Sequence, residues 1–195
     1  MLQYLLIVAS ALQIASAERI DVFGVAKCPD TSRFLRNQLA PFVEKFTDLP
    51  SDLTIEYHPV PSQMYLKGNK LISTCLHGEL ECKMNKLQAC AKKLYPGDGL
   101  TTVLCVQGKG DYALASACLK ADQKSKILAC AESQDGEQLL KEEAIARGKY
   151  GQGSTWMPWI SIDGTRSVEA EGGLEKVICG LKSMASNKKC DQYRK

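Results

Sequence analysis

The sequence lacks a second cysteine three positions after Cys28, an N-linked glycosylation sequon, and a long apolar run beyond its first residues. Position 31 is threonine, so the stretch KCPDTSRFL does not contain the cysteine pair of a Cys-x-x-Cys motif. No asparagine has Ser or Thr two residues later, so the N-glycan needed for mannose-phosphate delivery to lysosomes has no acceptor, which favours secretion. No run after residue 17 approaches the roughly 20 apolar residues that a transmembrane helix requires.

Strong charge of one sign is also missing. The formal net charge is +3 at pH 7, and Lys and Arg are scattered along the chain. The basic tail SNKKCDQYRK is short, and a solvated terminus explains it better than a nucleic-acid patch. We therefore expect neither nucleic acid nor a membrane as a partner.

The first 17 residues predict a signal peptide. Leu5 to Ile14 is mostly apolar, and Ala15-Ser16-Ala17 fits a small-x-small cleavage site before Glu18. The alternative is a buried N-terminal helix. The remaining residues, 18–195, suffice for one domain with a sizeable core. We expect a protein that is secreted to the extracellular space or held in the endosome–lysosome lumen.

Cysteines are abundant and odd in number. A secreted chain keeps its cysteines mainly as disulfides, and nine cysteines leave at least one without an intramolecular partner. Cys28 stands far from the others, so we expect four disulfides and one free thiol at Cys28. The remaining eight are Cys75, Cys82, Cys90, Cys105, Cys118, Cys130, Cys179 and Cys190.

The first part of the chain predicts a strand, a helix and a second strand. Arg19–Ala26 has the short β-branched pattern of a buried strand. An apolar stripe at helical spacing follows from about residue 30 to 46, and Pro29 suits the first turn of that helix. Asp52–Val60 predicts the second strand, so this region opens a βαβ unit.

Residues from about 63 to 152 predict short helices separated by Pro, Gly and Asp. Strand character returns at 159–162 and 165–168, joined by an Asp163-Gly164 turn, and a final amphipathic helix follows from about Gly172. This order matches an α/β thioredoxin-like fold with a disulfide-rich helical insertion between the second strand and the strand after Pro158. We expect residues 18–195 to form one composite domain, with an independent helical domain as the alternative.

The position of Cys28 gives it a plausible chemical role. A cysteine between the first strand and the first helix lies against unpaired backbone N–H groups, which stabilise a thiolate together with the helix dipole. Lys27 acts in the same direction and Asp30 opposes it. Thiolates attack disulfides, so Cys28 is a candidate nucleophile. The alternatives are a buried cysteine without chemistry and a bridge between two molecules.

Pro158 is the second candidate site residue. It directly precedes a strand that opens a hairpin, in WMPWISIDG. Enzymes of the thioredoxin fold hold a cis-proline at this place beside the nucleophile, where the neighbouring backbone pairs with an extended substrate. A proline at the first residue of a strand is also ordinary, so its weight comes from its combination with Cys28.

A longer motif runs from Cys75 to Cys90, CLHGELECKMNKLQAC, with the spacing C-x-H-G-x2-E-C-x2-N-x4-C. It resembles the signature of the gamma-interferon-inducible lysosomal thiol reductase family. The family pattern usually has Gln after the first cysteine, where this chain has Leu76, so any role of that side chain is in doubt. The resemblance extends from about Arg19 to Cys190 and includes the Pro-Trp strand.

This resemblance implies a thioredoxin-like fold and reduction of protein disulfides, often at acidic pH in endosomes or lysosomes. The implied partners are disulfide-containing proteins and a small-thiol reductant such as glutathione or cysteine, with no prosthetic cofactor. Of the 105 pairings that eight cysteines permit, we expect only Cys179–Cys190 and leave the others open.

Zinc is an alternative use of the motif, because Cys75, His77, Cys82 and Cys90 are all good zinc ligands. The secretory context favours disulfides and no metal. His77 and the only other histidine, His58, are interpreted as structural hydrogen-bonding groups.

The resemblance places the nucleophile at Cys28 and the resolving position at Thr31. Threonine forms no disulfide, but its hydroxyl is expected to donate a hydrogen bond to the Cys28 thiolate. Cys28 then attacks a substrate disulfide, and release requires an external thiol or the second thiol of the substrate. We expect a thiol–disulfide oxidoreductase whose turnover is weakened by Thr31. The alternatives are a secreted, disulfide-stabilised binding or immune-effector module with little turnover, and an inert structural protein.

Overall fold

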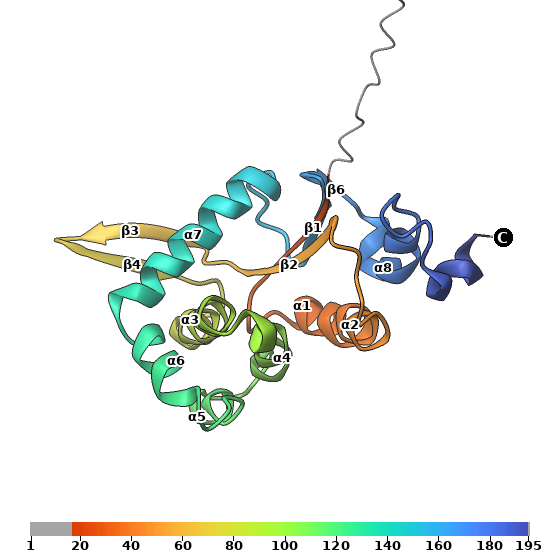
Figure 1. Ribbon diagram of the computed structural model, residues 1–195. Helices are drawn as coiled ribbons and strands as arrows, with labels where there is room; N and C mark the ends of the chain where they lie inside the picture. The colour runs from red at the N-terminus through yellow and green to blue at the C-terminus, as the bar shows by residue number, and fades with distance from the viewer. Residues whose placement is uncertain (1–16, 195) are drawn as a thin grey trace, which may run out of the picture.

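The computed structural model describes residues 17–194, so the expected signal peptide, apart from Ala17, lies outside the described residues. A four-stranded sheet forms the centre, in the order β2-β1-β5-β6 (Figure 1). β1 (Glu18–Gly24) pairs in parallel with β2 (Leu53–Pro59) and antiparallel with β5 (Trp159–Ile162). β6 (Thr165–Arg166) completes the sheet as a short edge strand.

The hairpin between β5 and β6 turns at Asp163 and Gly164, as the sequence predicted. Both residues have positive φ, 50° and 76°. This is the backbone conformation that a two-residue turn between antiparallel strands requires, and Asp-Gly adopts it readily. The second strand is shorter than expected and ends at Arg166.

One face of the sheet is covered by the helical segments that follow β1, together with the last long helix. α1 (Pro29–Phe34), a π-helical turn (Leu35–Leu39) and α2 (Ala40–Lys45) occupy the predicted helix. Pro41 has no N–H to give to the carbonyl one turn earlier, which accounts for the interruption. Their apolar stripe packs with α8 (Glu169–Cys179) against β1 in one core, which includes Ile20, Val22, Phe34, Leu35, Leu39, Phe42, Leu174 and Ile178.

The insertion between β2 and β5 begins differently from the prediction. Residues 63–74 form a β-hairpin, β3 (Gln63–Lys67) and β4 (Lys70–Thr74), which extends from the body beside α7 (Figure 1). The helical prediction for this stretch was therefore wrong. The turn at Gly68-Asn69 between two residue runs with β propensity accounts for the hairpin.

Helices make up the rest of the insertion. Their core is separate from the first one and is built around Met84, Leu87, Val106 and Ile127, with Ala26 from the main sheet region as a member. The last helix of the insertion, α7 (Gln134–Tyr150), covers the second face of the sheet. The helices are α3 (Glu79–Leu94), α4 (Pro96–Val106), α5 (Tyr112–Ser116), α6 (Lys124–Ala131) and α7 (Gln134–Tyr150).

Disulfides fasten this arrangement, and Cys28 is the free cysteine, as the cysteine count predicted. The expected bond between α8 and the C-terminal 3₁₀ helix (Lys188–Tyr193) is present. The four disulfides are Cys75–Cys82, Cys90–Cys130, Cys105–Cys118 and Cys179–Cys190. Within residues 17–194, no helix is long and apolar enough to cross a membrane.

Candidate active site

Cys28 lies where β1 gives way to α1. It is the N-cap of the helix, with extended φ and ψ of −71° and 124°, and Pro29 is the first helical residue. The backbone N–H of Thr31 donates to Cys28 Sγ at 3.5 Å. Only 9% of Cys28 is exposed. The sulfur therefore lies at a helix N-terminus, within reach of a backbone N–H donor.

Pro158 lies near this cysteine in the fold, although the two residues are far apart in the sequence. The Met157–Pro158 peptide bond is cis. The Cys28 thiol donates a long hydrogen bond to the Met157 carbonyl, with Sγ···O at 3.8 Å. The structure thus brings together the two residues that the sequence singled out.

Thr31 is completely buried, but its hydroxyl does not make the expected hydrogen bond to the sulfur. Among the described residues its hydroxyl has no hydrogen-bond partner. The prediction that this hydroxyl binds the Cys28 thiolate was wrong, and the backbone N–H of the same residue takes that role. The side chain points toward β1, where its methyl group packs over Gly24.

Gly24 allows this close packing, and its replacement makes a simple prediction. A Cβ at Gly24 would lie 2.5 Å from Thr31 Cγ2 and 2.8 Å from Tyr57 Oη. Both neighbours are buried, so Gly24→Ala is expected to lower the free energy of unfolding by about 1–3 kcal/mol. Unfolding in urea measures this free energy for the variant and the wild type. Gly97→Ala, where a Cβ meets nothing within 4 Å, is the control and should not destabilise. Equal stability of the two variants would contradict the packing.

An open cavity of about 360 Å³ lies beside Pro158. Trp156, which is 61% exposed, stands at this cavity, and Arg33 and Asp30 form an ion pair there at 3.0 Å. The cavity is mixed in character, with an aromatic surface, charges of both signs and amides. It is lined by Asp30, Arg33, Phe34, Asn37, Gln38, Trp156, Pro158, Glu171 and Gly172.

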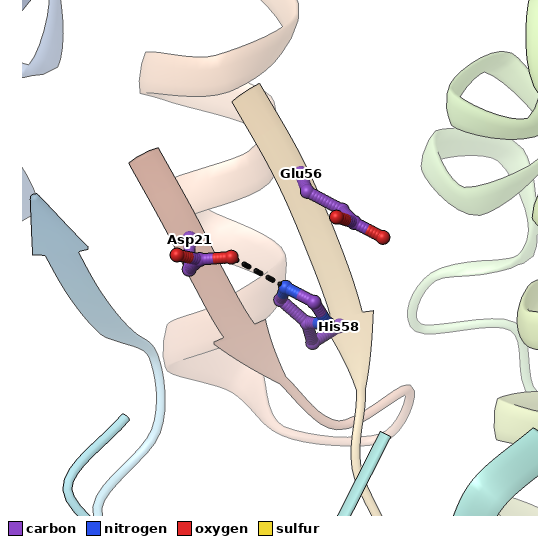
Figure 2. A group of neighbouring side chains, drawn as sticks. All are labelled: Asp21, Glu56 and His58. Carbon is purple, nitrogen blue, oxygen red and sulfur yellow. Dashed lines mark hydrogen bonds and ion pairs between the residues drawn. The ribbon is translucent and has the colours of Figure 1, made fainter. Parts of the chain in front are cut away.

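Three ionisable residues lie close together on the face of β1 and β2 that is covered by α7. Figure 2 shows Asp21 on one strand and Glu56 and His58 on the next, with Asp21 bonded to His58. Their ligand atoms lie within 4.8 Å of one another, close enough to share a metal ion. The Arg19 guanidinium already contacts Asp21 at 2.7 Å and Glu56 at 2.6 Å. A metal ion would have to displace this cation, so the residues fit an internal ion network better.

The zinc alternative for the Cys75–Cys90 motif is excluded by its bonding. Cys75 and Cys82 are bonded to each other, and Cys90 is bonded to Cys130. Zinc binds thiolates, and a sulfur in a disulfide is not one. His77 instead contacts Glu81, with Nδ1 2.5 Å from Oε2, which agrees with a structural role.

His58 lies between two carboxylates, an arrangement that favours its protonated form. Its Nε2 lies 2.8 Å from Asp21 Oδ1 and its Nδ1 lies 2.6 Å from Glu143 Oε2. Carboxylates only accept hydrogen bonds, so both ring nitrogens must donate. Burial alone would lower the pKa of His58, but the hydrogen bonds to Asp21 and Glu143 outweigh it and raise the pKa above 6.5.

The pKa values of the two acidic residues, Asp21 and Glu56, shift in the opposite direction and are lowered. Burial alone would raise the pKa of Asp21, yet hydrogen bonds from His58 and Arg19 lower it below 3.8. Burial likewise opposes the charge of Glu56, while Lys92, His58 and Arg19 lower its pKa below 4.5. Each of these three groups is therefore more stable in its charged form in the folded protein.

These shifts predict maximal stability in mildly acidic solution. The contribution of His58 is fully present below pH 6.5 and is lost as the pH rises through its raised pKa. The contributions of Asp21 and Glu56 are present above about pH 4.5 and are lost as the pH falls through their lowered pKa values. Thermal unfolding of the wild type should give a higher Tm at pH 5.5 than at pH 8.

His58→Gln keeps hydrogen-bonding capacity but cannot titrate, so it should flatten the alkaline side of this profile. Glu142→Gln, in which an exposed carboxylate near the network is replaced, is the matched control and should keep the wild-type shape. A Tm of wild type that rises steadily from pH 5.5 to pH 8 would contradict the assignment of charge to His58.

Reasoning from the sequence missed this network. The one signal was Asp21 within the apolar run IDVFGVA, since a charge in a buried strand requires a partner. Arg19 is a neighbour of Asp21 on the same strand, but the other members of the network come from distant segments. Arg19 and His58 lie on β1 and β2, while Glu143 lies on α7 in the insertion.

Comparison with known proteins identifies the family to which this chain is similar. Residues 19–134 match the model of the family described as gamma interferon inducible lysosomal thiol reductase (GILT). A GILT-like protein of Caenorhabditis elegans is 31% identical over 173 residues, which cover 82% of this chain and 78% of that protein. A gamma-interferon-inducible lysosomal thiol reductase of Carassius auratus is 24% identical, over 86% of this chain and 69% of that protein.

Solved structures show the same fold at low sequence identity. DsbA of Chlamydia trachomatis superposes with a TM-score of 0.55 at 12% identity, over 78% of each chain. The oxidoreductase NmDsbA1 of N. meningitidis gives 0.53 at 13% identity, over 94% of this chain and 87% of that one. These similarities confirm the expected thioredoxin-like fold.

Proposed function

Because this chain belongs to the gamma-interferon-inducible lysosomal thiol reductase family, we propose that it acts on protein disulfides through the single nucleophilic thiol of Cys28. Its family and its fold are those of thiol–disulfide oxidoreductases. The observation that carries the proposal is the position of Cys28, the free cysteine, at the N-cap of α1 and against the carbonyl of Met157.

In the first step the Cys28 thiolate attacks one sulfur of a substrate disulfide. The substrate S–S bond breaks, a bond between Cys28 Sγ and that sulfur forms, and the other sulfur leaves as a thiolate that takes up a proton. The Thr31 N–H, at 3.5 Å, stabilises the attacking thiolate before the reaction. The product is a mixed disulfide between Cys28 and the substrate.

The second step depends on a thiol from outside the site, because Thr31 has no sulfur. An external thiolate attacks Cys28 Sγ, releases the substrate as a thiol and leaves a mixed disulfide on Cys28. A second external thiol then restores Cys28, so two thiols are oxidised to one disulfide for each substrate disulfide reduced. If the substrate's own free thiol attacks the mixed disulfide instead, the result is isomerisation without net reduction.

The open cavity beside Pro158 is the proposed place for the substrate chain. Trp156 offers an exposed aromatic surface for the residues that flank the substrate cysteine. The backbone of Met157, adjacent to the sulfur, is placed to pair with an extended segment. We propose disulfide-containing proteins as substrates and glutathione or cysteine as the reductant, with no prosthetic group.

The proposed setting follows from the cysteines. The four disulfides suit an oxidising compartment. We propose that residues 1–17 are removed as a signal peptide, that residues 18–195 fold as one domain, and that the protein is secreted or resides in the endosome–lysosome lumen. The raised pKa of His58 is compatible with an acidic lumen.

Insulin reduction in the presence of glutathione tests this function. The wild type should reduce insulin faster than glutathione alone at pH 5 to 7.5, and the rate should rise in proportion to the glutathione concentration, because external thiol releases the substrate. No acceleration at any pH in this range would refute the enzyme and favour the binding or immune-effector module. Such a module should retain its partner when Cys28 is replaced by serine.

A further inference from the structure

The loop that leads from β1 to Cys28 is held by side chains of the insertion. The backbone N–H of Ala26 donates to Asn85 Oδ1 at 2.9 Å. The next N–H, that of Lys27, donates to Glu81 Oε2 at 3.2 Å. Glu81 and Asn85 are both 0% exposed and both lie on α3. The two backbone amides before the nucleophile thus have their partners in another part of the fold.

A second segment of the insertion binds the same loop from the end of α4. Gln107 Nε2 donates to the Val25 carbonyl at 3.0 Å, and the Gly108 N–H donates to the Ala26 carbonyl at 2.8 Å. Lys27 Nζ donates to the Lys109 carbonyl at 2.9 Å. Backbone groups of three consecutive loop residues are therefore bonded to the insertion, which leaves this loop little freedom to move.

Glu81 and Asn85 belong to the long cysteine motif, and the rest of the motif fixes them. The backbone N–H of His77 donates to Glu81 Oε1 at 3.3 Å, and His77 Nδ1 contacts Oε2. The Cys75–Cys82 disulfide fastens the turn before Glu81 to α3. The motif is thus a compact unit whose buried acceptors face the Cys28 loop.

Asn85 has a single orientation that satisfies all its neighbours. Its Oδ1 accepts from the Ala26 N–H, and its Nδ2 donates to the Val60 carbonyl at 3.0 Å and to Cys75 Sγ at 3.8 Å. Val60 packs with Cys28 in a small apolar cluster. Asn85 therefore holds the two segments that flank the nucleophile, one after β1 and one after β2.

We propose that Glu81 and Asn85 are positioning residues for the nucleophile: they hold the Ala26–Lys27 segment so that Cys28 Sγ stays at the N-terminus of α1. The proposal rests on the proposed role of Cys28. Neither residue touches the sulfur, so both act through the backbone of the loop. A buried amide that loses its acceptor is costly, and the loop would move to find water, which would take the sulfur away from the Thr31 N–H and from the substrate.

The test is the rate at which Cys28 attacks a small aromatic disulfide, followed by the release of the coloured thiolate. Glu81→Ala and Asn85→Ala are each expected to lower this rate by roughly tenfold at pH 5, because reaction depends steeply on the placement of the attacking atom. The loss should be smaller at pH 8 than at pH 5, so the ratio of the rates at pH 5 and pH 8 should fall, because the displaced sulfur loses the Thr31 N–H donor.

Glu137→Ala is the matched control. Glu137 is also a buried glutamate of the insertion, at 7% exposure, but it pairs with Lys86 and not with the loop. It should lower Tm and leave the attack rate and the pH ratio within about twofold of wild type, the scatter expected of a change that does not reach the site. If Glu81→Ala and Asn85→Ala behave as Glu137→Ala does, the positioning role is refuted.

A measurement on the wild type covers the case in which the variants do not fold. Hydrogen exchange of the Ala26 and Lys27 amides should be as slow as that of Val22 in the centre of β1, whereas fast exchange would refute the proposal. The attack assay needs no protein substrate. A protein that passes it and still fails to reduce insulin would refute the proposed function and leave the positioning role intact.

Discussion

Cys28→Ser is expected to lower insulin reduction at least about 1,000-fold, to the rate of glutathione alone, because the variant has no sulfur to attack a disulfide. Serine is a preferred N-cap, and its hydroxyl can accept the Thr31 N–H that Cys28 Sγ accepts now. The fold should therefore persist, with a Tm close to that of the wild type. The turbidity of precipitated insulin chains measures the activity, and thermal unfolding measures the fold.

The Cys28→Ser variant separates a loss of the reacting sulfur from a loss of the fold. A folded Cys28→Ser protein that still reduces insulin would mean that another sulfur, from one of the four disulfides, carries the reaction. The exposure of the pairs makes Cys105–Cys118 the first to examine, since Cys105 is exposed and Cys118 is half-buried. Cys105→Ala with Cys118→Ala is therefore a useful companion, and it should keep the activity.

Thr31→Cys should restore internal release. Positions three apart on a helix are neighbours, and the backbone of Thr31 already approaches Cys28 Sγ to 3.5 Å. In the absence of glutathione, we expect the introduced thiol to release substrate from the mixed disulfide at least about 100-fold faster than 1 mM glutathione does for the wild type, because the reaction becomes intramolecular. Rapid-quench mass spectrometry of the mixed disulfide measures this rate.

The Thr31→Cys substitution should change the stability of the fold little. The Thr31 hydroxyl is buried without a partner among the described residues, so replacing it loses no hydrogen bond. Thr31→Ser is the control, since it has the size of cysteine and no sulfur, and it should release substrate as slowly as the wild type does. A folded Thr31→Cys protein that also releases slowly would show that the distance or the orientation at this position does not suit a resolving thiol.

The parts of the fold that follow local rules could be predicted from the sequence. The apolar run after Glu18, Pro29 at the first helical turn and the Asp163-Gly164 turn each specify their own conformation through φ, missing donors or side-chain burial. Cys28 was identified as the free thiol by counting, and the short loop between Cys179 and Cys190 made that pair predictable.

The hairpin at residues 63–74 was missed because its side chains are mostly exposed. Without a buried face, the sequence shows no strict alternation of apolar and polar residues, and the helical pattern of the following region dominated the prediction. The pairing of Cys90 with Cys130 was unpredictable for a related reason, since it depends on the packing of α3 against α6.

The sequence identified the two residues that meet at the candidate site, but not the residues that support them. Cys28 and Pro158 were found because each stands at a recognisable junction of strand and loop or helix. The bonds from Glu81 and Asn85 to the Cys28 loop join residues more than 50 positions apart, and only the tertiary structure shows them. The same holds for His58 between Asp21 and Glu143.

The covalent adduct itself gives the most direct test of the central claim that Cys28 attacks a disulfide and cannot complete release alone. Reduced wild-type protein, with its four disulfides intact, is mixed at equal concentration with a disulfide that joins two separate peptides, without any other thiol, and then analysed by mass spectrometry. We predict one peptide bound to Cys28, one peptide released as a thiol, and an adduct that persists until glutathione is added. Absence of the adduct at Cys28, whether the peptides are fully reduced or unreacted, would contradict the account.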